Sequence, residues 1–179
     1  MSELPPEAYV ASIAGFRNMN IHRLSALMRH HEPEEAWQVV LGERPAQGLL
    51  GRLSATERSD VQKAWRVCAR QRPPERVWNR CVELGVRVLL PRDPGFPGVL
   101  LDDPSPPPVL LVPADLGLLT GRRVAIVGTR NATAAGRDAA RTLGFGLAVN
   151  GVHVVSGLAR GIDGHAHRGV LAAEGEGRP

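Results

Sequence analysis

Residues 122–161 carry the strongest pattern in the chain, RRVAIVGTRNATAAGRDAARTLGFGLAVNGVHVVSGLARG. The uninterrupted apolar run at 124–127 is typical of a strand that is covered on both faces. A helical segment over 136–150 and a second apolar run from Val152 follow, and a second helix is expected over 162–173. This order of strand, helix, strand and helix predicts an α/β fold with a parallel, Rossmann-like sheet and right-handed crossovers.

The part of the chain that precedes this pattern has helical periodicity. Over residues 7–80, apolar side chains recur at every third or fourth position, and the segment Glu32-Pro33-Glu34-Glu35 marks a helix start. The tryptophans at 37, 65 and 78 lie on these apolar faces, so we expect them to pack in a core. The pattern predicts a small all-α domain over residues 1–84.

Residues 85–121 differ from both flanking regions because they are rich in proline. Prolines at this density exclude a helix and favour an extended chain, and the apolar runs at 86–90 and 109–112 predict strands. We expect an ordered, proline-rich connector that adds an edge strand to the next domain. Two further strands are few for a covered parallel sheet. We therefore expect residues 122–179 to be the first half of a larger, here incomplete, Rossmann-like domain that folds or binds weakly alone.

Composition narrows the class of protein. The 179 residues are 43% hydrophobic and 22% charged, which indicates a globular chain. Neither a signal peptide nor an apolar run of about 20 residues is present, so we expect a cytoplasmic location and no membrane partner. The net charge is +4, with basic clusters at 52–80 and 122–179. These basic clusters are compatible with a polyanionic partner. If charge is the only evidence considered, ordinary solvent-exposed helix faces are the better explanation.

Two loops follow the carboxyl ends of the predicted parallel strands, the edge where open α/β sheets bind ligands. Each loop leads into a helix N-terminus, where unpaired N–H groups and the helix dipole favour an anion. The spacing matches neither G-x-G-x-x-G nor a Walker A loop, so a mononucleotide or a nucleic-acid backbone is favoured over a dinucleotide. The candidate phosphate-binding residues are Gly128, Thr129 and Arg130 in the first loop and Ser156, Gly157, Arg160 and Gly161 in the second.

Catalytic and metal-binding patterns are weak. His165 and His167 are two positions apart, so on a helix they would not share a face and could not hold one metal ion together. No arrangement of Ser, His and Asp or of Cys and His indicates a nucleophile. Asp163 is expected to cap the helix or to hold Arg130 or Ser156 in place. We therefore expect a binding protein without a metal, a cofactor or enzymatic activity.

The two loops and the proline-rich region resemble the DprA (Smf) family of DNA-processing proteins. The stretches that carry this resemblance are VAIVGTRN at 124–131, VVSGLARGIDGHAHRG at 154–169, LPRDPGFP at 90–97 and PPPVL at 106–110. The resemblance extends from about residue 84 to the end and implies an extended Rossmann fold, with the helical N-terminus standing where the family has a small SAM-like domain. It also implies phosphate contact by the two loops, with Asn131, Ala159, Ile162 and Asp163 supporting them.

The same resemblance implies a function. It implies binding of single-stranded DNA without sequence preference, loading of RecA recombinase onto that strand in natural transformation, and a homodimer in the full-length protein. One alternative is a nucleotide-processing Rossmann enzyme similar to the lysine-decarboxylase-like phosphoribohydrolases, which would need a glycine-rich motif that bears a glutamate. Another is a protein-interaction fragment whose helical domain docks a partner.

Overall fold

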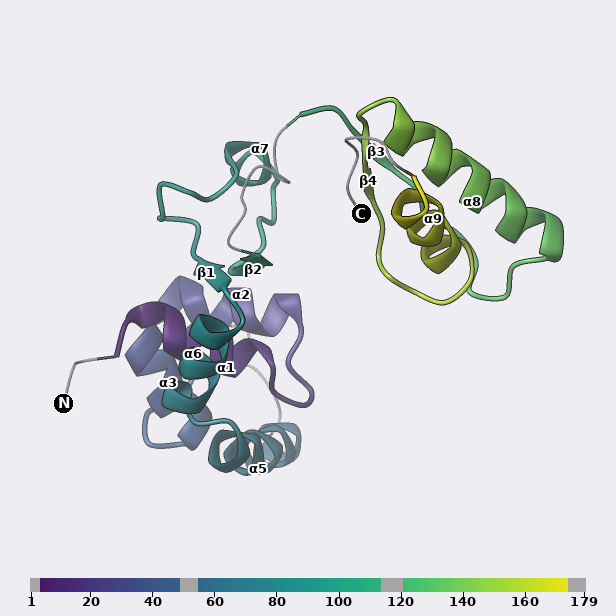
Figure 1. Ribbon diagram of the computed structural model, residues 1–179. Helices are drawn as coiled ribbons and strands as arrows, with labels where there is room; N and C mark the ends of the chain where they lie inside the picture. Colours follow the sequence, from purple (N-terminus) through teal and green to yellow (C-terminus); the bar gives the residue numbers. More distant parts are fainter. Residues whose placement is uncertain (1–3, 49–54, 114–120, 174–179) are drawn as a thin grey trace. The chain divides into compact units, whose positions relative to one another are not determined.

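The computed structural model describes residues 4–48, 55–113 and 121–173. The chain divides into two compact units, Met1–Asp115 and Leu116–Pro179. The first unit is mainly helical, and the second combines a strand pair with two helices (Figure 1). Among the described residues, no helix is both long enough and apolar enough to cross a membrane.

Within residues 4–83 of the first unit, the described helices are α1 (Pro6–Ala14), α2 (Ile21–His30), α3 (Pro33–Leu41), α5 (Ala55–Gln71) and α6 (Pro74–Glu83). Polar side chains fix where two of them begin. The Asn20 side-chain oxygen accepts the Arg23 N–H at the start of α2, with 2.9 Å between the two atoms. Glu32 and Glu35 form a reciprocal capping box at the start of α3. The predicted all-α region is therefore built from helices with local start signals.

The helices of the first unit enclose an apolar core. Its most deeply buried side chains include Val10, Ile13, Leu27, Val39 and Val40. Trp65 is 2% exposed in this core, and Trp37 lies at its edge with its ring centroid 5.7 Å from that of Phe16. Trp78 packs against a second buried cluster. All three tryptophans thus pack against buried apolar residues, as their spacing predicts.

The proline-rich region belongs to the first unit. Strand β1 (Val86–Leu89) pairs antiparallel with β2 (Leu110–Pro113), and the short helix α7 (Gly98–Leu101) lies between them in the chain. Val88 is buried in a cluster with Ala11 and Cys81, and Leu90 enters the core of the helical bundle.

These contacts correct two expectations. Among the described residues, β2 pairs with β1 and adds no edge strand to the sheet of the second unit, because the apolar residues of β1 pack directly on the adjacent bundle. The expectation that prolines exclude a helix is also wrong, since α7 follows Pro97 and contains no proline itself.

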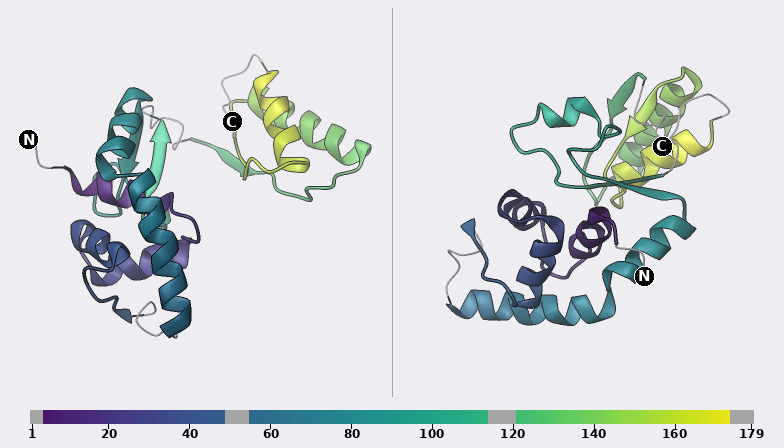
Figure 2. Two further views of the ribbon diagram at one scale, coloured as in Figure 1. Left: turned by 90° about the horizontal axis from the view of Figure 1, so that it is seen from below. Right: turned by 90° about the vertical axis from the view of Figure 1, so that its left-hand side faces the viewer.

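The second unit has the predicted order of strand, helix, strand and helix. Strands β3 (Arg123–Ala125) and β4 (His153–Val155) pair in parallel, with Val124 opposite Val154. Helix α8 (Ala134–Val149) connects them and α9 (Ile162–Leu171) follows β4, so that the two helices lie side by side against the strand pair (Figures 1 and 2). The α/β fold class is therefore confirmed.

The helices cover one face of this strand pair. The core between them contains Ala140, Ala148, Val154, Ala166 and Val170. Successive strand residues point to opposite faces, and Val155, the neighbour of buried Val154, is 52% exposed. All three residues of β3 are exposed as well. The expectation of strands covered on both faces is therefore wrong for the described residues, because α8 and α9 both pack on the Val154 side.

Two glycines let α8 and α9 touch through their backbones. A Cβ atom on Gly144 would lie 2.2 Å from the carbonyl oxygen of Ala166, and one on Gly169 would lie 2.0 Å from that of Arg141. No side chain fits at either distance, so only glycine permits this approach. The contact fixes the separation of the two helices that follow the predicted loops.

Replacing Gly144 by alanine should destabilise the second unit by about 1–3 kcal/mol, because the added methyl group forces the two helices apart. Gly146→Ala is the matched control on the same helix, since its Cβ would meet no atom within 4 Å. That change should stabilise the unit by roughly 0.5–1 kcal/mol, because alanine loses less backbone entropy on folding. Urea unfolding followed by circular dichroism measures both effects, and equal effects would contradict the close helix contact.

Candidate functional site

The two predicted loops interlock at one edge of the strand pair. The first loop (residues 126–133) joins β3 to α8, and the second loop (residues 156–161) joins β4 to α9. The Ile162 N–H donates to the carbonyl oxygen of Thr129, with 3.2 Å between nitrogen and oxygen. Gly161 has a φ of 89°, and a Cβ there would lie 2.2 Å from that same Thr129 oxygen. A glycine at 161 is therefore required both for its backbone conformation and for the contact between the loops.

A single carboxylate ties the two loops together. Asp163, in the first turn of α9, accepts the Gly128 N–H at 3.2 Å with one oxygen and the Gly157 N–H at 3.1 Å with the other. Asp163 is buried, with only 5% of its surface exposed. The sequence predicted that Asp163 supports the loops, and the structure identifies the groups it holds as one backbone amide from each loop.

These contacts change the acidity of the carboxyl group. Burial by itself raises the pKa of Asp163. Hydrogen bonds from the N–H groups of Gly128, Gly157 and Ala159 and from the Ser156 hydroxyl lower it by more than burial raises it, so the pKa lies below the usual aspartate value. The carboxylate is therefore charged at neutral pH. Its negative charge is stabilised by hydrogen bonds from backbone N–H groups of the loops.

Several predicted phosphate-binding groups have partners inside the loops. The N–H groups of Gly128 and Gly157 donate to Asp163. The Ser156 hydroxyl donates to the Ile126 carbonyl oxygen, which lies 2.6 Å from Ser156 Oγ. The Thr129 hydroxyl accepts the Asn131 N–H at 3.2 Å and keeps its own hydrogen to donate. Phosphate contact by these four residues stays a prediction, and the structure shows that each also holds its own loop in shape.

A hollow of about 510 Å³ opens beside the loops and contains the candidate cations. Its lining residues are Arg130, Asn131, Ala132, Arg137, Arg160, Gly161, Gly164, His165 and Arg168. Four of the predicted site residues, at 130, 131, 160 and 161, are among them. The guanidinium-bearing residues of the helices, Arg137 and Arg168, were missed. Positions 161, 164, 165 and 168 are separated by three or four residues, which places them on one face of a helix. This spacing in the second motif could have identified Arg168 from the sequence.

The part of the chain that the structure describes supplies no ion-pair partner for the arginines of this hollow. Residues 121–173 contain seven arginines and two aspartates, Asp138 and Asp163. No carboxylate lines the hollow, and among the described residues none of its four arginines forms an ion pair. Asp163 accepts backbone N–H groups and forms no ion pair with these arginines among the described residues. The arrangement is that of a site for a negatively charged ligand.

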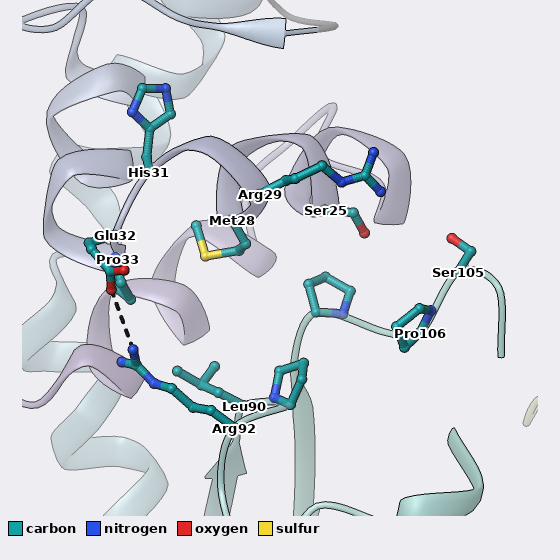
Figure 3. Close-up of a pocket in the computed structure, with 12 residues that line it drawn as sticks. Ser25, Met28, Arg29, His31, Glu32, Pro33, Leu90, Arg92, Ser105 and Pro106 are labelled. Carbon is teal, nitrogen blue, oxygen red and sulfur yellow. Dashed lines mark hydrogen bonds and ion pairs between the residues drawn. The ribbon is translucent and has the colours of Figure 1, made fainter. Parts of the chain in front are cut away.

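A second cavity of about 350 Å³ lies in the first unit, between α2, the start of α3 and the loops that flank the β1–β2 pair (Figure 3). Its walls are mostly apolar, with Met28, Leu90 and several prolines. Of its two arginines, Arg92 pairs with Glu32, whose Oε2 lies 3.3 Å from Arg92 Nη1. This partial neutralisation makes it a weaker anion site than the hollow of the second unit.

The two histidines of the second motif lie on a helix, as predicted. His165 lines the hollow, whereas His167 is buried. The two imidazoles therefore lie in different environments. Over the described ranges, no group of three or more His, Cys, Asp or Glu residues is placed to hold a metal ion.

Comparison with known protein families and sequences gives matches that each cover about half of the chain. The model of the family described as DNA recombination-mediator protein A matches residues 87–177. Protein Smf of Synechocystis sp. is 43% identical over 94 residues, which cover 49% of this chain and 23% of that protein. DNA processing protein DprA of Bacillus subtilis is 38% identical over 94 residues, which cover 52% of this chain and 32% of that protein. The chain thus spans less than a third of the length of either relative.

A solved structure resembles the fold of the chain. The X-ray structure of DNA processing protein A from Streptococcus pneumoniae aligns with 99% of this chain and 57% of that one, with a TM-score of 0.53 and 21% sequence identity. At this level of identity the likeness bears on the fold alone.

The lowered pKa of Asp163 predicts how the loops respond to acid. Because the folded-state pKa is depressed, the stabilisation is present above the unfolded value of about 3.9 and is lost as the pH falls through the lower, folded-state value. The amide resonances of Gly128 and Gly157 should therefore shift together in an NMR titration, with a midpoint below the usual aspartate range.

Substitutions of the two aspartates separate this effect from general acid unfolding. Asp163→Asn should abolish the shared titration and lower the exchange protection of both amides. Asp138→Asn, at an exposed position on α8, is the matched control and should leave both unchanged. Independent titration of the two amides in the unsubstituted chain would contradict the shared carboxylate.

Proposed function

The chain belongs to the DNA recombination-mediator protein A family, and from this premise we propose that the hollow of its second unit binds the sugar-phosphate backbone of single-stranded DNA. One observation carries this proposal. Arg130 and Arg160 stand on two interlocked loops and line a hollow in which no described residue contributes a carboxylate. A guanidinium binds phosphate oxygens through a planar fork of donors, and such contacts do not depend on base identity.

The geometry favours a nucleic-acid strand over a dinucleotide cofactor. In dinucleotide sites a glycine-rich turn leaves its amides free for the pyrophosphate. Here the N–H groups of Gly128 and Gly157 are held by Asp163, and the cationic side chains stand beyond them at the hollow. Binding then rests on charge, which gives an affinity that falls steeply with salt.

We further propose that the chain acts by binding and that it catalyses no reaction of its own. The role we assign is to hold single-stranded DNA so that RecA recombinase is loaded onto it in recombination and transformation, with a homodimer as the working form of the full-length protein. The family description, a DNA recombination mediator, supports this role. Release of free base from a nucleoside monophosphate would contradict it and favour a phosphoribohydrolase.

Arg130→Gln should weaken binding of oligothymidylate and of a mixed-sequence single strand by the same factor, because a phosphate contact carries no sequence information. The slope of log affinity against log salt should become shallower by about 0.7, the value for one phosphate contact on a single strand. Fluorescence anisotropy over a salt series that begins at low salt measures both quantities. An unchanged slope, or a loss confined to one sequence, would contradict the assignment.

A matched control for this substitution lies in the same unit. Arg141 is exposed on α8 and does not line the hollow. Arg141→Gln removes the same charge from the unit but no group from the hollow. If the salt dependence comes from phosphate contacts in the hollow, this variant should leave the salt slope nearly unchanged. Equal losses from both substitutions would indicate a diffuse charge effect.

The proposed recombination role has its own test. On single-stranded DNA coated with a single-strand-binding protein, addition of the chain should shorten the lag before RecA begins to hydrolyse ATP. Arg130→Gln should shorten that lag less, because it occupies less of the DNA. An unchanged lag at concentrations where the unsubstituted chain is bound to the DNA would contradict RecA loading while leaving DNA binding intact.

A further inference from the structure

We propose that Arg137 and Arg168 complete the hollow as a second phosphate position, so that the site holds two successive phosphates of one strand. This inference rests on the proposed binding of single-stranded DNA and extends it from the loops to the helices. Neither residue lies in the two loops, whose residues were predicted from the sequence to contact phosphate. Both line the same hollow as Arg130 and Arg160.

Arg137 is held over the hollow by a contact with the first loop. It lies in the first turn of α8, and its guanidinium Nη1 donates to the carbonyl oxygen of Ala132, 3.2 Å away. Ala132 itself lines the hollow. Because one donor is anchored on the loop, the remaining N–H groups of the guanidinium are oriented in advance, which reduces the entropy lost when they bind an anion.

Arg168 reaches the hollow from α9. Gly164, His165 and Arg168 are spaced so that they share one face of this helix, and all three line the hollow. The backbone contacts at Gly144 and Gly169 hold α9 close against α8, the helix that carries Arg137. The position of Arg168 relative to Arg137 therefore follows from helix packing and not from a flexible loop.

The amount of charge indicates more than one phosphate. Four guanidinium groups line a hollow without a carboxylate, and among the described residues none of the four is ion-paired. A phosphodiester carries a single negative charge, so one such group would leave most of this charge uncompensated. Consecutive phosphates of a strand supply several negative charges at close spacing. A polyanionic strand is thus a better chemical match than a single phosphodiester.

The test measures the binding of a short oligothymidylate to the full chain by fluorescence anisotropy over a salt series. Arg137→Gln and Arg168→Gln should each make the salt slope shallower by about 0.7 and weaken binding about fivefold at 0.1 M salt. The corresponding Arg→Lys variants should keep the slope, because they keep the charge. Arg141→Gln is the control, and urea unfolding of every variant shows that the fold is retained.

A competition experiment addresses the number of phosphates. Thymidine monophosphate should displace the labelled strand only at much higher concentrations than a thymidine trinucleotide does. Equal potency of the two competitors would overturn the second phosphate position.

The outcomes separate this inference from the proposed function. If Arg130→Gln weakens binding while the Arg137 and Arg168 variants behave like Arg141→Gln, the extension is wrong and DNA binding by the loops stands. If the unsubstituted chain binds no oligonucleotide even at low salt, both are wrong. If the Lys variants lose the slope as the Gln variants do, the two arginines act through structure and the inference is overturned.

Discussion

The Asp163 carboxylate is the contact on which the candidate site depends. It accepts one backbone N–H from each of two loops that leave neighbouring parallel strands, at 3.2 Å from Gly128 and 3.1 Å from Gly157. Two loops of a small unit have many conformations open to them, and a shared buried acceptor leaves few in which both amides are satisfied. Among the described residues, this carboxylate forms no ion pair with an arginine. A guanidinium paired with an aspartate would have fewer N–H groups free for a ligand, whereas an aspartate held by backbone amides leaves the donors of the arginines available.

Close backbone packing gives the rest of the frame. Gly161 lets the second loop rest on the carbonyl groups of the first, and Gly144 and Gly169 let α8 and α9 meet without intervening side chains. Each of these positions excludes a Cβ because another backbone atom occupies its place. The arginines are thereby carried by elements whose separations are set by main-chain contact. This matters for a binding site made of long side chains, because a guanidinium is only as well placed as the backbone from which it extends.

The sequence predicted the second unit better than it predicted the site within it. The apolar runs around Val124 and Val154 and the loops after them were sufficient for the strand, helix, strand and helix order, because continuous apolar strands and glycine-marked turns are local signals. No local sequence signal indicated which group accepts the hydrogen bonds of the loop amides. A phosphate and a carboxylate are both anions, so the pattern of free N–H groups before a helix predicts an anion without saying whether it comes from a ligand or from Asp163. Arg137 and Arg168 were missed because helical faces converge only once the α8–α9 contact is known.

The proline-rich region shows the same limit from the other side. Its strands were predicted near their observed positions. The prediction paired them with the sheet that follows in the sequence, because that sheet is next along the chain. Strand pairing is decided by where the apolar face is buried. Val88 and Leu90 find buried neighbours in the bundle that precedes them, so β1 and β2 pair with each other in the first unit. The described residues that line the hollow all lie between Arg130 and Arg168, in the second unit. The residues of the candidate site therefore all lie in the segment from β3 to α9, where one carboxylate holds the loops and four guanidinium groups, none of them ion-paired among the described residues, line the hollow.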